Sequence, residues 1–151
     1  MTGPSPFRSI LALVDGTESA MRASECAIRL AGAMSARLTA IAVVDTHTLR
    51  RLMSVRILVE PEAQEFEAGL QQTQQRYLDY VAQLAAKEQV AIETVLGRGE
   101  WHVTVLAEQK TRQADLIVLG GFRTTLTRLD LLARERQLII DEAPCPVLVV
   151  K

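Results

Sequence analysis

Short apolar runs alternate along the chain with longer segments of mixed polarity. The runs are rich in valine, isoleucine, leucine and alanine, and turn-forming residues such as Asp15 and Gly16 end the first of them. Runs of roughly four to eight apolar residues between turn signals predict buried β-strands. The predicted strands are residues 7–14, 37–44, 91–96, 116–119 and 147–150.

Between these runs, apolar or small residues recur every three or four positions, which is the spacing of an amphipathic helix. The stripe within residues 17–34 consists of Ala20, Ala23, Ala27, Leu30, Ala31 and Met34. Pro61 suits a first helical turn, and the stripe that follows it consists of Phe66, Leu70, Thr73, Tyr77, Tyr80, Val81 and Leu84. Helices are also predicted around residues 103–107 and 126–140, whereas residues 45–60 lack periodicity and are predicted to form a loop.

The alternation of strands and helices predicts an α/β fold. Parallel strands need crossover helices, and those helices bury both faces of the sheet. We therefore expect one domain, residues 1–151, with a doubly wound, five-stranded parallel sheet. With a strand order of 3-2-1-4-5, such a sheet binds ligands in the crevice between strands one and four, where Asp15-Gly16-Thr17 and Gly120-Gly121 would meet.

Composition and charge exclude several classes of function. Lys and Arg number 17 against 18 Asp and Glu, for a formal net charge of -1, which does not favour binding to nucleic acid or to an anionic membrane. No run approaches the roughly 20 apolar residues of a membrane span, and no signal peptide is evident. We therefore expect a cytoplasmic protein. Cys26 and Cys145 lie far apart without a CxxC motif, so we expect ordinary core thiols.

The sequence contains no evident catalytic or metal-binding motif. His47 and His102 lie in unrelated segments, and surface or turn positions are the default for both. A Walker P-loop is missing, which argues against an ATP-hydrolysing enzyme. Trp101 is expected to pack at a helix start. We predict no catalytic residues, no metal and no cofactor.

Four segments resemble the universal stress proteins: ILALVDGTESA, AIAVV, ADLIVLGG and APCPVLVV. The resemblance spans nearly the whole chain. It implies a five-stranded parallel sheet, commonly a homodimer, and membership in a family that contains both nucleotide binders and non-binders. In the binders, the loop after the fourth strand reads G-x2-G-x9-G-[S/T] and holds the phosphates.

Only one of the four positions of that motif is retained. Counting back from Ala143 without gaps places the motif on Gly120, Arg123, Ala133 and Arg134. Glycine lets a chain approach a phosphate with no Cβ in the way, so Arg123 is a poor substitute. The stretch after Leu119 is therefore interpreted as the remains of a nucleotide site.

In the same alignment, two positions of the last predicted helix differ from the family pattern. Glu135 falls where the family pattern has an apolar residue, and Arg136 where it has a small one. Either the helix is rotated or the alignment shifts by a residue or two. Four arginines in this stretch either form an anion site of another design or lie on a solvated helix face. They are Arg123, Arg128, Arg134 and Arg136.

Asp15 matches the family's acidic residue that contacts the nucleotide, although Asp15 and Thr17 also suit a turn and a helix cap. We hypothesise that Arg123 or Arg134 folds into the vacated phosphate pocket and pairs with Asp15. An alternative hypothesis keeps a degenerate site for AMP, ADP, ATP or another anionic small molecule. Its candidate residues are Asp15, Gly16, Thr17, Val43, Val44, Gly120, Gly121, Arg123 and Arg134.

The apolar strand at the end of the chain predicts self-association. An exposed apolar terminal strand invites aggregation unless it is paired or covered, and symmetric pairing with a second copy would cover it. The predicted interface consists of Val147, Leu148, Val149 and Val150. The leading expectation is thus a dimeric interaction module of the universal stress type, with an unidentified protein partner and without ATP.

Overall fold

The computed structural model describes residues 5–121 and 131–151. These residues contain a five-stranded sheet of order β3-β2-β1-β4-β5, in which every pairing is parallel. The strands are β1 (Ser9–Leu13), β2 (Arg37–Val44), β3 (Glu93–Arg98), β4 (Leu116–Gly120) and β5 (Val147–Val150). The helices are α1 (Glu18–Met34), α2 (Thr46–Ser54), α3 (Glu60–Lys87), α4 (Trp101–Arg112) and α5 (Leu131–Glu142). The predicted fold class and strand order are confirmed.

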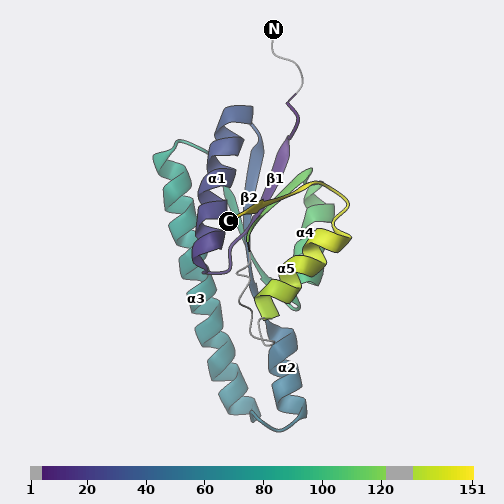
Figure 1. Cartoon of the computed structure of the whole chain (residues 1–151). Coiled ribbons are helices and arrows are strands. Elements are labelled where there is room, and N and C mark those ends of the chain that lie inside the picture. Colours follow the sequence, from purple (N-terminus) through teal and green to yellow (C-terminus); the bar gives the residue numbers. More distant parts are fainter. Residues whose placement is uncertain (1–4, 122–130) are drawn as a thin grey trace.

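The helices cover both faces of the sheet, with α1 and α3 on one side and α4 and α5 on the other (Figure 1). Alternate residues of β1 face the two layers, because successive side chains of a strand point to opposite faces. Ile10 and Ala12 belong to the core under α1 and α3. Leu11 and Leu13 belong to the core under α4 and α5. The sheet is therefore buried on both faces, which explains its nearly continuous apolar strands.

Small residues bring α1 close to the sheet. Ala20, Ala23, Ala27 and Ala31 are each at most 2% exposed. The approach is close at the end of β4, where a Cβ on Gly120 would lie 2.5 Å from the backbone nitrogen of Ala20. This close approach sets the start of α1 beside the carboxyl end of β4.

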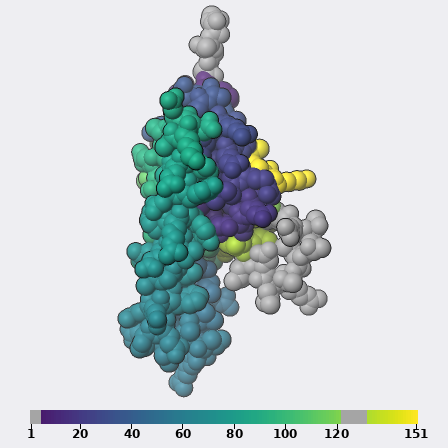
Figure 2. Space-filling model, turned by 90° about the vertical axis from the view of Figure 1, so that its left-hand side faces the viewer, coloured from purple at the N-terminus to yellow at the C-terminus, as the bar shows by residue number. Residues whose placement is uncertain are grey.

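The segment between β2 and β3 differs from the prediction. Residues predicted to form a loop contain α2, which begins after its N-cap Asp45. Helix α3 continues past the sheet and packs against α2 (Figures 1 and 2). Of the predicted α3 stripe, Phe66 and Tyr80 are 53% and 48% exposed, because the first lies beyond the sheet and the second is turned from it. The buried positions of α3 are Ala63, Leu78, Val81 and Ala85.

Other helix and strand boundaries differ from the predicted ones by a few residues. β3 lies two residues later than predicted, and the described part of the last helix begins at Leu131. The predicted helical residues 126–130 lie outside the described residues. In the two described ranges, no helix is long and apolar enough to cross a membrane.

We predict that Gly120→Ala destabilises the fold by about 1–3 kcal/mol or more, because the added methyl group would overlap backbone atoms of α1. Gly69→Ala is the matched control. Nothing lies within 4 Å of a Cβ at Gly69 on α3, so alanine should stabilise that helix by about 0.5–1 kcal/mol. Urea unfolding of both variants measures the difference, and equal effects would contradict the packing described here.

Candidate functional site

The turn after β1 places a carboxylate at the crevice of the sheet. Asp15 Oδ1 accepts hydrogen bonds from the backbone nitrogen of Thr17 at 3.1 Å and from its hydroxyl at 2.6 Å. Thr17 in turn caps α1 by accepting a bond from Ala20 N at 3.2 Å. The capping interpretation of this segment is therefore correct, and it orients the second oxygen of Asp15 toward α5.

Arg136 of α5 fills the space between the ends of β1 and β4. Its Nε and Nη2 donate to Asp15 Oδ2 at 3.1 and 2.5 Å. Nη2 also donates to Thr17 Oγ1 at 2.7 Å, and Nη1 donates to the carbonyl oxygen of Gly121 at 2.7 Å. The guanidinium group thus joins the turn after β1, the start of α1 and the end of β4.

Burial makes this ion pair unlike a surface salt bridge. The side chains of Arg136 and Asp15 are 6% and 1% exposed. A buried charge is tolerated when it is paired and hydrogen-bonded, and both conditions are met here. Ser19 completes the group by donating from its hydroxyl to the Gly121 carbonyl at 3.1 Å.

Among the described residues, Arg136 rather than Arg134 is the arginine that lies against Asp15. Arg134 is exposed and lines a separate cavity near α2, because helical residues two positions apart point about 200° apart. Arg123 lies outside the described residues. The hypothesis is therefore wrong for Arg134, and the described partner of Asp15 is Arg136.

The remaining predicted site residues lie close to the crevice but differ in their exposure to solvent. Gly120 ends β4 and Gly121 follows it, both beside Ser19. Gly16 adopts a φ of +80° under the ring of Tyr77. Val43 and Val44 are 1% and 0% exposed. These two valines therefore belong to the core and present no surface to a ligand.

A second group of polar side chains lies at the start of α4. The Nδ1 atom of His102 is 2.6 Å from Glu135 Oε2 and 3.8 Å from Glu100 Oε1. Glu135 Oε2 also accepts from the backbone nitrogen of His102 at 2.8 Å, so α5 caps α4. Trp101 lies between Glu100 and His102 in the sequence, and its side chain is buried, as predicted. Sequence spacing gave no sign of this cluster, because Glu135 comes from another helix.

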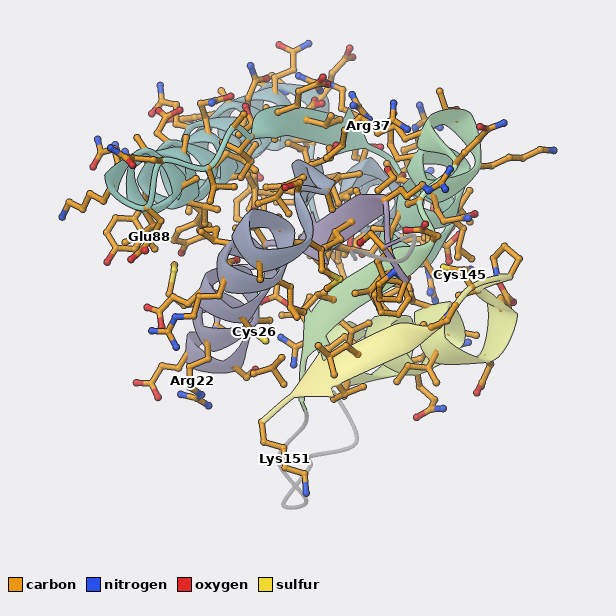
Figure 3. The ribbon with its side chains drawn as sticks, turned by 90° about the horizontal axis from the view of Figure 1, so that it is seen from above. Arg22, Cys26, Arg37, Glu88, Cys145 and Lys151 are labelled. Carbon is orange, nitrogen blue, oxygen red and sulfur yellow. The ribbon has the colours of Figure 1, made fainter. Side chains whose placement is uncertain are left out.

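The cysteines are partly buried and separate. Figure 3 shows Cys26 on α1 and Cys145 at the turn between α5 and β5. Burial raises the pKa of the Cys145 thiol, and the nearby charge of Asp115 raises it further. A thiol with a raised pKa is a poor nucleophile at neutral pH, so the geometry favours no thiol chemistry at Cys145.

Comparison with known proteins identifies the family. Residues 6–151 match the universal stress protein family. The chain belongs to this family. It is similar to the universal stress protein MJ0531 of Methanocaldococcus jannaschii, with 29% identity over 149 residues, which cover 99% of this chain and 85% of the relative.

Solved structures of universal stress proteins share the fold. One, a complex with cAMP, has a TM-score of 0.67 and 18% identity, covering 96% of this chain and 97% of the other. Another, from Archaeoglobus fulgidus in complex with dAMP, has a TM-score of 0.65 and 16% identity, covering 97% and 99%. The family thus includes proteins that hold adenine nucleotides.

We predict that Arg136→Met destabilises the protein by about 3–5 kcal/mol, because it leaves the Asp15 carboxylate buried without its cation. The exposed neighbour provides the control: Arg134→Met should change stability by no more than about 0.5 kcal/mol. Chemical denaturation measures both.

The double variant Asp15→Asn, Arg136→Met tests the pairing itself. Because it removes both charges, it should lose less stability than Arg136→Met alone. A double variant that loses the sum of the two single effects would show that the two side chains act independently.

Proposed function

We propose that this universal stress protein is a dimeric interaction module of the stress response, which acts in the cytoplasm, binds no ATP and catalyses no reaction. The observation that carries the proposal is the position of the Arg136 guanidinium in the crevice. It bonds to Asp15, Thr17 and Gly121. The resemblance assigns Asp15 to a nucleotide, and Thr17 and Gly121 are among the candidate residues of the degenerate site. The protein thus provides its own cation where a ligand would have to enter.

The energetic argument concerns displacement. A phosphate in this crevice would bring negative charge next to the Asp15 carboxylate unless Arg136 abandoned that carboxylate for the ligand. Leaving either charge buried and unpaired is strongly unfavourable. ATP, with three phosphates, would also need the glycines that the sequence replaces by Arg123 and Ala133.

An exposed apolar surface supports a role in protein contacts. Five large apolar side chains are exposed from the end of α2 to the start of α3. They are Met53, Val55, Ile57, Val59 and Phe66, with exposed fractions from 37% to 65%. This part of the chain forms the projecting end of the molecule (Figure 2). All five come from one continuous segment of the chain, and exposed apolar side chains that form a contiguous patch are typical of interaction sites.

The second candidate function is binding of a small adenine nucleotide or another anion in the degenerate crevice. The relatives that hold cAMP and dAMP support it, since a single phosphate needs a smaller cradle than ATP does. In this case Arg136 would exchange Asp15 for the phosphate, because guanidinium groups bind both carboxylate and phosphate in a bidentate manner.

Thermal unfolding in the presence of nucleotides separates the two functions. A ligand at about 100 times its dissociation constant stabilises a protein by roughly 2.7 kcal/mol. We expect no change in Tm with ATP, AMP or cAMP. Native mass spectrometry of the freshly purified protein should show no added nucleotide mass. A rise in Tm with AMP but not with ATP would favour the second function, and a rise with ATP would contradict the first.

Self-association is proposed to occur through β5, which pairs only with β4 among the described strands. Leu148 and Val149 are 36% and 38% exposed on this edge. Pairing with a second copy would satisfy the free backbone groups of the edge and cover these side chains.

We predict that the protein sediments as a dimer at micromolar concentration and that Val149→Lys converts it to a monomer. Val103→Lys is the matched control, because Val103 is 53% exposed on α4, on another face. It should remain a dimer. A monomeric parent protein, or a Val149→Lys variant that stays dimeric, would contradict this interface.

A further inference from the structure

The polar cluster at the start of α4 contains the donors of a metal site. Glu100, His102 and Glu135 each offer one ligand atom, and these atoms lie within 4.8 Å of one another. One imidazole nitrogen and two carboxylate oxygens suit divalent ions such as Zn²⁺ and Mn²⁺. The three side chains come from the turn before α4, from α4 and from α5, so the tertiary fold alone brings them together.

The convergence of two carboxylates on one nitrogen needs an explanation. Glu135 already occupies His102 Nδ1 at 2.6 Å and caps α4. Glu135 therefore binds His102 and caps α4 without any contribution from Glu100. Yet Glu100 also directs an oxygen to within 3.8 Å of the same nitrogen. Positive charge between two carboxylates relieves their repulsion, and either a protonated imidazole or a metal ion on Nδ1 supplies such a charge.

The cluster is accessible from solvent. Glu100 and Glu135 line a cavity of about 350 Å³ next to α2. The side chains of Glu100, His102 and Glu135 are 35%, 14% and 16% exposed. An ion could therefore enter and retain water on the cavity side, while the protein ligands stay held by packing. His47 lines the same cavity, so both histidines of the chain lie near it.

The charges around the cavity permit a cation. Three carboxylates, Asp45, Glu100 and Glu135, line it together with Arg51 and Arg134. The Asp45 carboxylate is bonded to the backbone nitrogen and hydroxyl of Thr48 at 2.9 and 2.7 Å. It is therefore committed to capping α2. The two remaining carboxylates are those that face His102.

We propose that Glu100, His102 and Glu135 bind one divalent transition-metal ion, with water completing its coordination on the cavity side. The imidazole would be neutral, with its proton on Nε2 and its Nδ1 on the ion. The bond between Nδ1 and Glu135 would be replaced by two bonds to the metal. Three protein ligands and one water form a typical open zinc site. This site is separate from Arg136, so the proposal is independent of the proposed function.

Titration of the chelator-treated protein with ZnCl₂ and MnCl₂, followed by calorimetry, tests the site. We expect one Zn²⁺ per chain and weaker binding of Mn²⁺. His102→Gln should weaken Zn²⁺ binding by about 100-fold or more, because loss of even an outer-shell partner costs about 10–100-fold. His47→Gln is the matched control and should keep the affinity of the parent protein.

The Glu100→Gln variant distinguishes the loss of a metal ligand from a structural effect. Glu100 makes no side-chain bond that caps α4, so this variant should fold normally and still bind Zn²⁺ at least about 10-fold more weakly. X-ray absorption of the zinc complex should show nitrogen and oxygen ligands without sulfur. Sulfur ligands would assign the zinc to Cys26 or Cys145 instead. Sulfur ligands, unchanged binding in His102→Gln, or equal losses in His47→Gln would overturn the proposal.

Discussion

The buried ion pair between Asp15 and Arg136 is the interaction on which the carboxyl edge of the sheet depends. Desolvating two charges costs several kcal/mol per ion, and only close pairing with further hydrogen bonds offsets it. Here the guanidinium group has oxygen acceptors on Asp15, Thr17 and Gly121. The pair therefore fixes α5 relative to the ends of β1 and β4.

This constraint changes the chemistry of the crevice. In a doubly wound sheet, the ends of the two central strands form the usual ligand site, and the amides and glycines there commonly meet an anion. In this chain, a cation from α5 meets the acid that follows β1. The crevice is neutralised internally, and a ligand must compete with an intramolecular partner that is always present.

The orientation of α5 also creates the second polar region. Arg136 points toward β1, whereas the preceding residue, Glu135, reaches the start of α4. Adjacent residues of a helix point about 100° apart. One turn of α5 therefore directs Arg136 to the end of β1 and Glu135 to the start of α4, at the same edge of the sheet. The ion pair and the donor cluster at His102 thus both depend on how α5 packs.

The sequence by itself determined the fold class and the approximate positions of the strands, because apolar runs and turn residues are local signals. The strand order was expected for a doubly wound sheet, and the resemblance to the family matched Asp15 to its acidic residue. It also showed that Arg136 stands where the family has a small residue, but it did not show where that side chain points. The capped helix α2 lacked a long apolar stripe, since only Leu49 is buried, and its periodicity was therefore missed. The tertiary structure decided which arginine pairs with Asp15 and which acids surround His102. The contacts of Glu135 with His102 and of Arg136 with Asp15 join residues 33 and 121 positions apart, and only the packing of α5 against the sheet and α4 sets their distances.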